Sequence, residues 1–144
     1  MPLSSIGVNE MSWQPSTTKV LPDEFDEVLA SYNVAVFHFY ASWNRYDVTI
    51  DQILREIADT YKDRIFIGSI DTDDQENWER CKELRILNLP AIAAFVNGQH
   101  FETVIGLLSK ESLSAKVEKW SNTARAQHFA ILRPASRSTN LRNS

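Results

Sequence analysis

The sequence predicts an α/β fold in which helices sandwich a mixed β-sheet of four to five strands. The run Val34–Tyr40 is almost wholly apolar and rich in β-formers, which is typical of a strand buried on both faces. Between Ile50 and Tyr61, by contrast, apolar side chains recur at helical spacing. The Asn97-Gly98 dipeptide lies between two further apolar runs and is a strong hairpin signal, which adds antiparallel strands.

The N-terminal half predicts two strands and two helices. Residues 1–16 are polar and aperiodic, so we expect a flexible N-terminal arm. Residues 17–21 predict a short edge strand, after which Pro22 suits the first turn of a helix. Beyond the buried strand, the stripe from Ile50 to Tyr61 predicts an amphipathic helix.

The middle of the chain predicts another strand and a short helix. Residues 64–70 form an apolar run, and the acidic segment after them suits a helix N-terminus. A helix over residues 75–84 is expected to turn three side chains inward, namely Trp78, Cys81 and Leu84. Strands that alternate with helices in this way pair in parallel through right-handed crossovers.

The C-terminal part predicts the hairpin and a long last helix. Its strands cover residues 91–96 and 101–105, and Ser109 is a suitable N-cap for the helix that follows. One apolar stripe continues that helix to about Leu132, two residues before Pro134.

These elements place one domain at residues 17–122, followed by a basic C-terminal extension, 123–144, that is helical at first and then disordered. From Ser121 to Ser144 there are four arginines and no acid, which gives +4 and leaves −8 on residues 1–120. Because an acidic body repels phosphates, we expect no nucleic-acid partner. The extension is a candidate surface for a homodimer.

Nothing in the sequence predicts a membrane segment or a secretory signal. No apolar run approaches the roughly 20 residues of a membrane helix, and the N-terminus lacks a basic start followed by an apolar stretch. Cys81 is the only cysteine, which excludes an internal disulfide and any CxxC redox or zinc motif. We therefore expect a cytoplasmic protein with no metal and no cofactor.

Four local motifs, in this order along the chain, resemble those of the thioredoxin family. They are a strand end with its tryptophan, the approach to a proline, the hairpin and the turn into the last helix: Phe39–Trp43, Leu84–Pro90, Phe95–Gly98 and Ile105–Lys110. The resemblance covers about residues 17–122 and implies a thioredoxin fold with Pro90 as the family's cis-proline. It also implies a shallow apolar groove, in which the family holds an extended segment of a partner.

The sequence departs from the family at the residues that carry the redox chemistry. After Trp43 the family has Cys-Gly-Pro-Cys, whereas this sequence has Asn44-Arg45-Tyr46-Asp47. Dithiol exchange needs one thiolate to attack a disulfide and a second thiol to release the mixed disulfide. Ala91 also replaces the threonine that usually follows the cis-proline. We therefore expect a redox-inactive member, in which Asn44 caps a helix and Asp47 places a negative charge in its first turn.

His38 and Cys81 each have a structural and a functional interpretation. His38 occupies the place where many thioredoxins have a buried carboxylate. It is either a core histidine with one hydrogen-bonded nitrogen or a pH-sensitive group that contacts Asp47 or Tyr46 and gates the nearby surface. Cys81 is either a buried, inert thiol or a reactive one, which would require exposure and a lowered pKa.

The residues around Trp43 and Pro90 predict a protein-binding groove. The candidates are Trp43, Asn44, Arg45, Tyr46, Asp47, Leu89, Pro90 and Ala91. Exposed aromatic side chains and an arginine suit the centre of an interface, although the same aromatics could pack on the end of the sheet.

The preferred function is an adaptor or chaperone-like module that binds a protein or extended peptide segment. One alternative is a monothiol or glutathione-linked oxidoreductase that uses Cys81. The other is a structural subunit assembled through its C-terminal helix.

Overall fold

The computed structural model describes residues 13–132, where the predicted order of elements is confirmed. The strands are β1 (Thr18–Lys19), β2 (Val34–Tyr40), β3 (Phe66–Asp71), β4 (Ala91–Val96) and β5 (Gln99–Ile105). The α-helices are α2 (Phe25–Ser31), α3 (Arg45–Tyr61), α4 (Trp78–Glu83) and α5 (Lys110–Leu132), with 3₁₀ turns at Pro22–Glu24, Lys62–Arg64 and Gln75–Asn77. Residues 1–12 of the expected arm and 133–144 of the extension lie outside the described residues.

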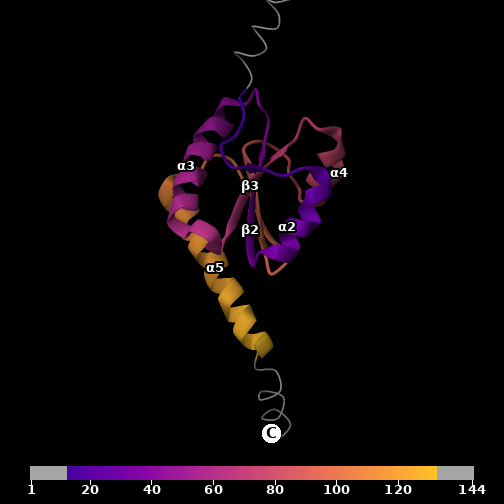
Figure 1. The fold of residues 1–144 in the computed structure, drawn as a ribbon. Coiled ribbons are helices and arrows are strands. Elements are labelled where there is room, and N and C mark those ends of the chain that lie inside the picture. Colours follow the sequence, from indigo (N-terminus) through magenta and orange to yellow (C-terminus); the bar gives the residue numbers. More distant parts are fainter. Residues whose placement is uncertain (1–12, 133–144) are drawn as a thin grey trace, which may run out of the picture.

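The five strands form one mixed sheet in the order β1-β3-β2-β4-β5. Strands β1, β3 and β2 are parallel, whereas β4 runs antiparallel to β2 and β5 antiparallel to β4. Helices α3 and α5 cover one face and α2 and α4 the other (Figure 1). The predicted α/β sandwich is therefore confirmed.

The central strand β2 is buried along its whole length because both faces of the sheet are covered. Successive side chains of a strand point to opposite faces. Accordingly, Val34 and Val36 pack with α3 and α5, while Ala35, Phe37 and Phe39 pack with α2 and α4. This double burial explains why the sequence of β2 is continuously apolar rather than alternating.

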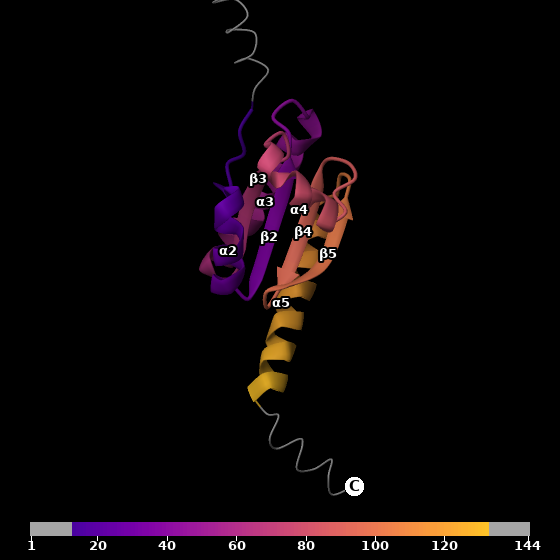
Figure 2. The same cartoon turned by 90° about the vertical axis from the view of Figure 1, so that its right-hand side faces the viewer.

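The hairpin turn also holds the last helix. Asn97 and Gly98 both adopt positive φ, 51° and 82°, as a two-residue hairpin turn of this type requires. The Asn97 amide N–H donates to the Asn33 carbonyl oxygen at 2.7 Å, and the Asn97 side chain donates to Gln127 of α5 at 2.9 Å. The helix reaches Leu132, as predicted, and its last turns extend past the sheet (Figure 2).

The prediction that Trp78, Cys81 and Leu84 all face inward is wrong for Trp78. Leu84 is buried and Cys81 half-buried, but Trp78 is 54% exposed. Six residues of an α-helix turn through about 240° beyond one full revolution, so Trp78 and Leu84 cannot share a face. Residues 75–77 moreover form a 3₁₀ turn, so the predicted helix is not continuous.

Gly68 of β3 leaves no room for a side chain. A Cβ added there would lie 2.8 Å from the backbone oxygen of Thr18 in β1 and 2.6 Å from the Phe66 ring. We predict that Gly68→Ala lowers the free energy of unfolding by about 1–3 kcal/mol through overpacking. Urea unfolding checks this against Thr49→Ala, a position of α3 outside the core. An unchanged urea midpoint for Gly68→Ala would contradict the tight β1–β3 approach.

Candidate functional site

The N-terminus of α3 is capped as the sequence predicts. The Oδ1 atom of Asn44 accepts a hydrogen bond from the Tyr46 amide N–H at 3.0 Å. This satisfies one of the amide groups that the first turn of a helix leaves without a partner. Arg45 and Tyr46 lie on the exposed side of this turn, with Tyr46 58% exposed.

Asp47 lies in the first turn of α3, as predicted, and its carboxylate is buried against His38. The His38 Nε2 atom lies 2.9 Å from Asp47 Oδ1, and both side chains are completely buried. Asp47 Oδ2 also accepts from the Ala41 amide N–H at 3.1 Å. Its carboxylate is buried because position 47 lies on the side of α3 that faces β2.

His38 is a core histidine with one hydrogen-bonded nitrogen, the first of its two predicted forms. Its Nδ1 atom is buried and has no hydrogen-bond partner among the described residues. The contact with Asp47 also meets the geometric condition of the second, pH-sensitive form. The buried His38–Asp47 contact therefore links β2 to the first turn of α3.

The last residues of the expected N-terminal arm pack over this pair. The Trp13 ring centroid lies 6.5 Å from that of His38 and 5.9 Å from that of Tyr40, edge to face in the second case. The Tyr40 hydroxyl donates to Gln14 at 3.2 Å, and Ser16 donates twice to the Asp51 carboxylate. Burial, together with nearby carboxylates, raises the pKa of Tyr40 to about 12. Residues 13–16 thus belong to the packed body.

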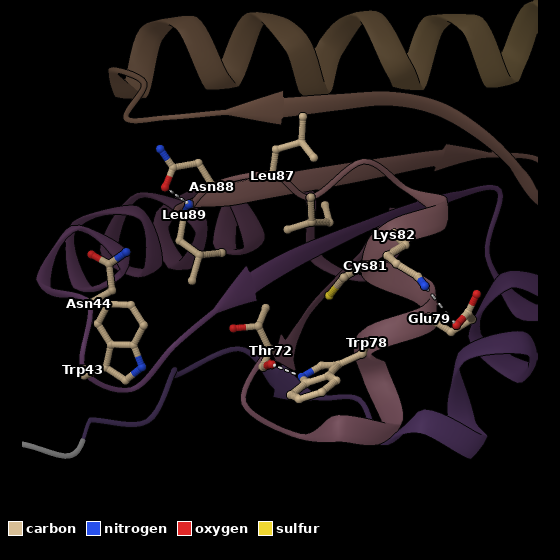
Figure 3. Close-up of a pocket in the computed structure, with 11 residues that line it drawn as sticks. Trp43, Asn44, Thr72, Trp78, Glu79, Cys81, Lys82, Leu87, Asn88 and Leu89 are labelled. Carbon is tan, nitrogen blue, oxygen red and sulfur yellow. Dashed lines mark hydrogen bonds and ion pairs between the residues drawn. The ribbon is translucent and has the colours of Figure 1, made fainter.

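A largely apolar groove of about 640 Å³ opens beside the N-terminus of α3 (Figure 3). Its walls come from the loop after β2, from α4 and from the segment before Pro90. The lining residues are Trp43, Asn44, Thr72, Trp78, Glu79, Cys81, Lys82, Ile86, Leu87, Asn88 and Leu89. Two exposed indoles are among the lining residues, Trp43 at 65% and Trp78 at 54% exposure. The Trp78 Nε1–H donates to the Thr72 carbonyl oxygen at 3.1 Å.

Three of the eight predicted groove residues line this groove, namely Trp43, Asn44 and Leu89. The predictions for Asp47, Pro90 and Ala91 are wrong in that all three are buried beneath it. Asp47 is turned inward by its contact with His38, and Ala91 belongs to the buried strand β4. The Leu89–Pro90 peptide bond is cis.

Sequence reasoning missed the wall formed by α4 and the segment before Pro90. Two signals pointed to it. Trp78 does not fit the helical stripe that carries Leu84, and Leu87 is an apolar residue that belongs to no periodic pattern. The structure shows Leu87 to be 83% exposed beside the groove.

Cys81 is not the fully buried cysteine that one prediction required. Its side chain is half-buried and lines the groove, where Figure 3 shows it on the wall formed by α4. Burial raises the pKa of its thiol. A raised pKa keeps the thiol protonated near neutral pH and opposes nucleophilic attack. The place of Cys81 in the groove thus favours a reactive thiol, whereas its raised pKa favours an inert one.

Between residues 13 and 132, no three His, Cys, Asp or Glu side chains are grouped so that they could hold a metal ion. Over the same part of the chain, no helix combines the length and the apolar character needed to cross a membrane.

The His38–Asp47 pair generates a stability prediction. Asp47→Ala leaves His38 Nε2 and the Ala41 amide N–H buried without partners, so we expect a loss of about 3–5 kcal/mol in the free energy of unfolding. Replacing both His38 and Asp47 with leucine should cost less than Asp47→Ala alone. Urea unfolding measures both, with Thr49→Ala as the control on the same helix. A double variant less stable than Asp47→Ala would argue against a coupled pair.

Comparison with known proteins places this geometry in a family. The sequence model of the thioredoxin family matches residues 16–119 of this chain. The chain is 33% identical over 101 residues to a chloroplastic M-type thioredoxin of Chlamydomonas reinhardtii, covering 69% of this chain and 71% of the relative. It is 30% identical over 105 residues to a thioredoxin of Griffithsia pacifica, covering 72% and 94%.

Solved structures agree in fold. A mutant thioredoxin from Halobacterium salinarum superimposes with a TM-score of 0.64 at 22% identity, covering 75% of this chain and 91% of that one. Oxidised mitochondrial thioredoxin 3 from Saccharomyces cerevisiae gives 0.63 at 21% identity, covering 71% and 94%. The chain belongs to the thioredoxin family.

Proposed function

We propose that this chain is a redox-inactive thioredoxin-family domain that binds an extended, apolar protein segment in the groove between Trp43, α4 and Leu89. The observation that carries the proposal is the groove itself, about 640 Å³ in volume and lined mainly by apolar side chains. The function is that of an adaptor or chaperone-like module, in which the bound segment is held and not chemically changed.

The two indoles favour a protein partner. Trp43 and Trp78 are both more than half exposed, and they come from different elements that meet at this groove. An aromatic side chain can bury about 150–250 Å² of surface, and tryptophans at the centre of an interface commonly dominate its binding energy. An extended segment that covers both indoles would therefore bind mainly through apolar contact.

The groups at the helix N-terminus favour binding over dithiol exchange. The resemblance places two cysteines of the family at positions 44 and 47. Here Asn44 is engaged as the helix cap, and Asp47 is buried with His38 and Ala41. With Cys81 as the only cysteine, the chain cannot form an internal disulfide.

Selection of linear peptides from a displayed library against the full chain tests the proposal. We expect selected peptides to carry large apolar side chains and to shift the emission of the exposed tryptophans. Trp43→Ala and Trp78→Ala should each weaken their binding by about tenfold or more, as hot-spot residues do. Phe129→Ala, an equally exposed aromatic at the far end of α5, is the matched control. Peptides that bind both tryptophan variants normally would refute the groove as the site.

A monothiol oxidoreductase that uses Cys81 is the second candidate, because the thiol lines the same groove. Burial raises the pKa of Cys81, so a smaller fraction of the thiol is ionised in the folded chain than in the unfolded one. We predict that iodoacetamide alkylates Cys81 more slowly in the native chain than in urea. The pH at which the native rate is half-maximal should also be higher.

The pH profile separates acidity from simple shielding, because shielding lowers the rate without moving the midpoint. A lower midpoint in the native chain would favour the oxidoreductase instead. So would reduction of insulin above the rate with dithiothreitol alone, provided that Cys81→Ser abolishes it.

A further inference from the structure

A second pocket, of about 380 Å³, lies at the opposite end of β2 from the groove. The start of β2, the end of α3 with its following turn, and the last turns of α5 form its walls. The lining residues are Asn33, Val34, Tyr61, Arg64, Ile65, Ser121, Ala124, Arg125, His128 and Phe129. The end of α5 that forms one wall extends past the sheet in Figure 2.

Two guanidinium groups from different elements give this pocket its charge. Among the described residues, Arg64 donates only to the backbone oxygens of Tyr61 and Thr60, at 3.3 and 3.5 Å, and it lies over the Tyr61 ring. Arg125 donates to the Asn122 side-chain oxygen. Both partners are neutral, and among the described side chains neither arginine forms an ion pair.

The acidic residue Glu118 lies beside the pocket residue Tyr61 and is already engaged. Glu118 accepts a hydrogen bond from the Tyr61 hydroxyl and does not line the pocket. Burial and this bond raise the pKa of Tyr61 to about 12, while Arg64 and Arg125 both act in the opposite direction. Both arginines line the pocket, and none of the residues that line it is acidic.

A polar side chain without a partner lines the same pocket. Ser121 is only 9% exposed, and its Oγ atom has no hydrogen-bond partner within residues 13–132. A buried hydroxyl without a partner costs free energy, which a bound acceptor or donor would recover. Val34, Ile65, Ala124 and the 59% exposed Phe129 supply apolar surface beside it.

We propose that this pocket binds a small organic anion, in which a carboxylate or phosphate group pairs with Arg64 and Arg125 while an apolar part lies against Val34 and Phe129. Guanidinium groups recognise both kinds of oxyanion through charge-assisted hydrogen bonds. The C-terminal residues 133–144 do not suit the site, because they carry three arginines and no acid. This inference is independent of the peptide-binding function, which uses the other end of the sheet.

Titration of the ¹⁵N-labelled full chain with phenyl phosphate, with benzoate and with neutral benzyl alcohol tests this inference. We expect at least one of the two anions to shift the amide signals of residues near 64–65 and 121–125 in a saturable way. The neutral analogue should not do so. Which anion binds more tightly identifies the phosphate or the carboxylate as the preferred group, and added salt should weaken the binding.

Charge-removing variants complete the test. Arg64→Gln and Arg125→Gln should each weaken binding of the preferred anion by about tenfold, and together they should abolish it. Arg55→Gln, an exposed arginine on α3 outside the pocket, should leave the affinity unchanged. The inference is overturned if neither anion saturates these signals, if the two pocket variants bind normally, or if the shifts map to residues 78–89 instead.

Discussion

The buried contact between His38 and Asp47 is the constraint on which the candidate groove depends. It joins the middle strand of the sheet to the first turn of α3, and Asp47 also accepts from the Ala41 amide N–H at the start of the connecting loop. That loop carries Trp43. Completely buried polar groups therefore anchor the start of the loop that carries the exposed indole.

The same contact explains how a thioredoxin fold can present a surface without a thiol pair. The resemblance implies that many thioredoxins have a carboxylate on the strand, at the place of His38, and a thiol on the helix, at the place of Asp47. Here an imidazole lies on the strand and a carboxylate on the helix, so each group satisfies the other. Asn44 satisfies the helix terminus as well. The groove at this end of the sheet is lined mainly by apolar surface, which supports binding by contact area.

The two ends of β2 differ in chemistry because different elements reach them. At the carboxyl end, α4 and the segment before Pro90 contribute apolar side chains, and residues 13–16 close over the polar pair. At the amino end, the long helix α5 passes the hairpin and brings Arg125 into the pocket that Arg64 also lines. The Asn97 side chain holds this part of α5 through its bond to Gln127.

Local signals along the chain were enough to predict the fold, the element order and the helix cap, whereas the sites depend on packing between elements. A buried strand is continuously apolar, a two-residue hairpin needs residues that tolerate positive φ, and Asn44 stands directly before an amphipathic stripe. Each of these signals is contained in a short stretch of the sequence. Asp47, by contrast, turns inward because His38 offers it a buried partner, and Arg64 and Arg125 line one pocket although the two share no local pattern. How whole elements pack against the sheet decides these pairings, and the spacing of residues along any one element does not contain that information.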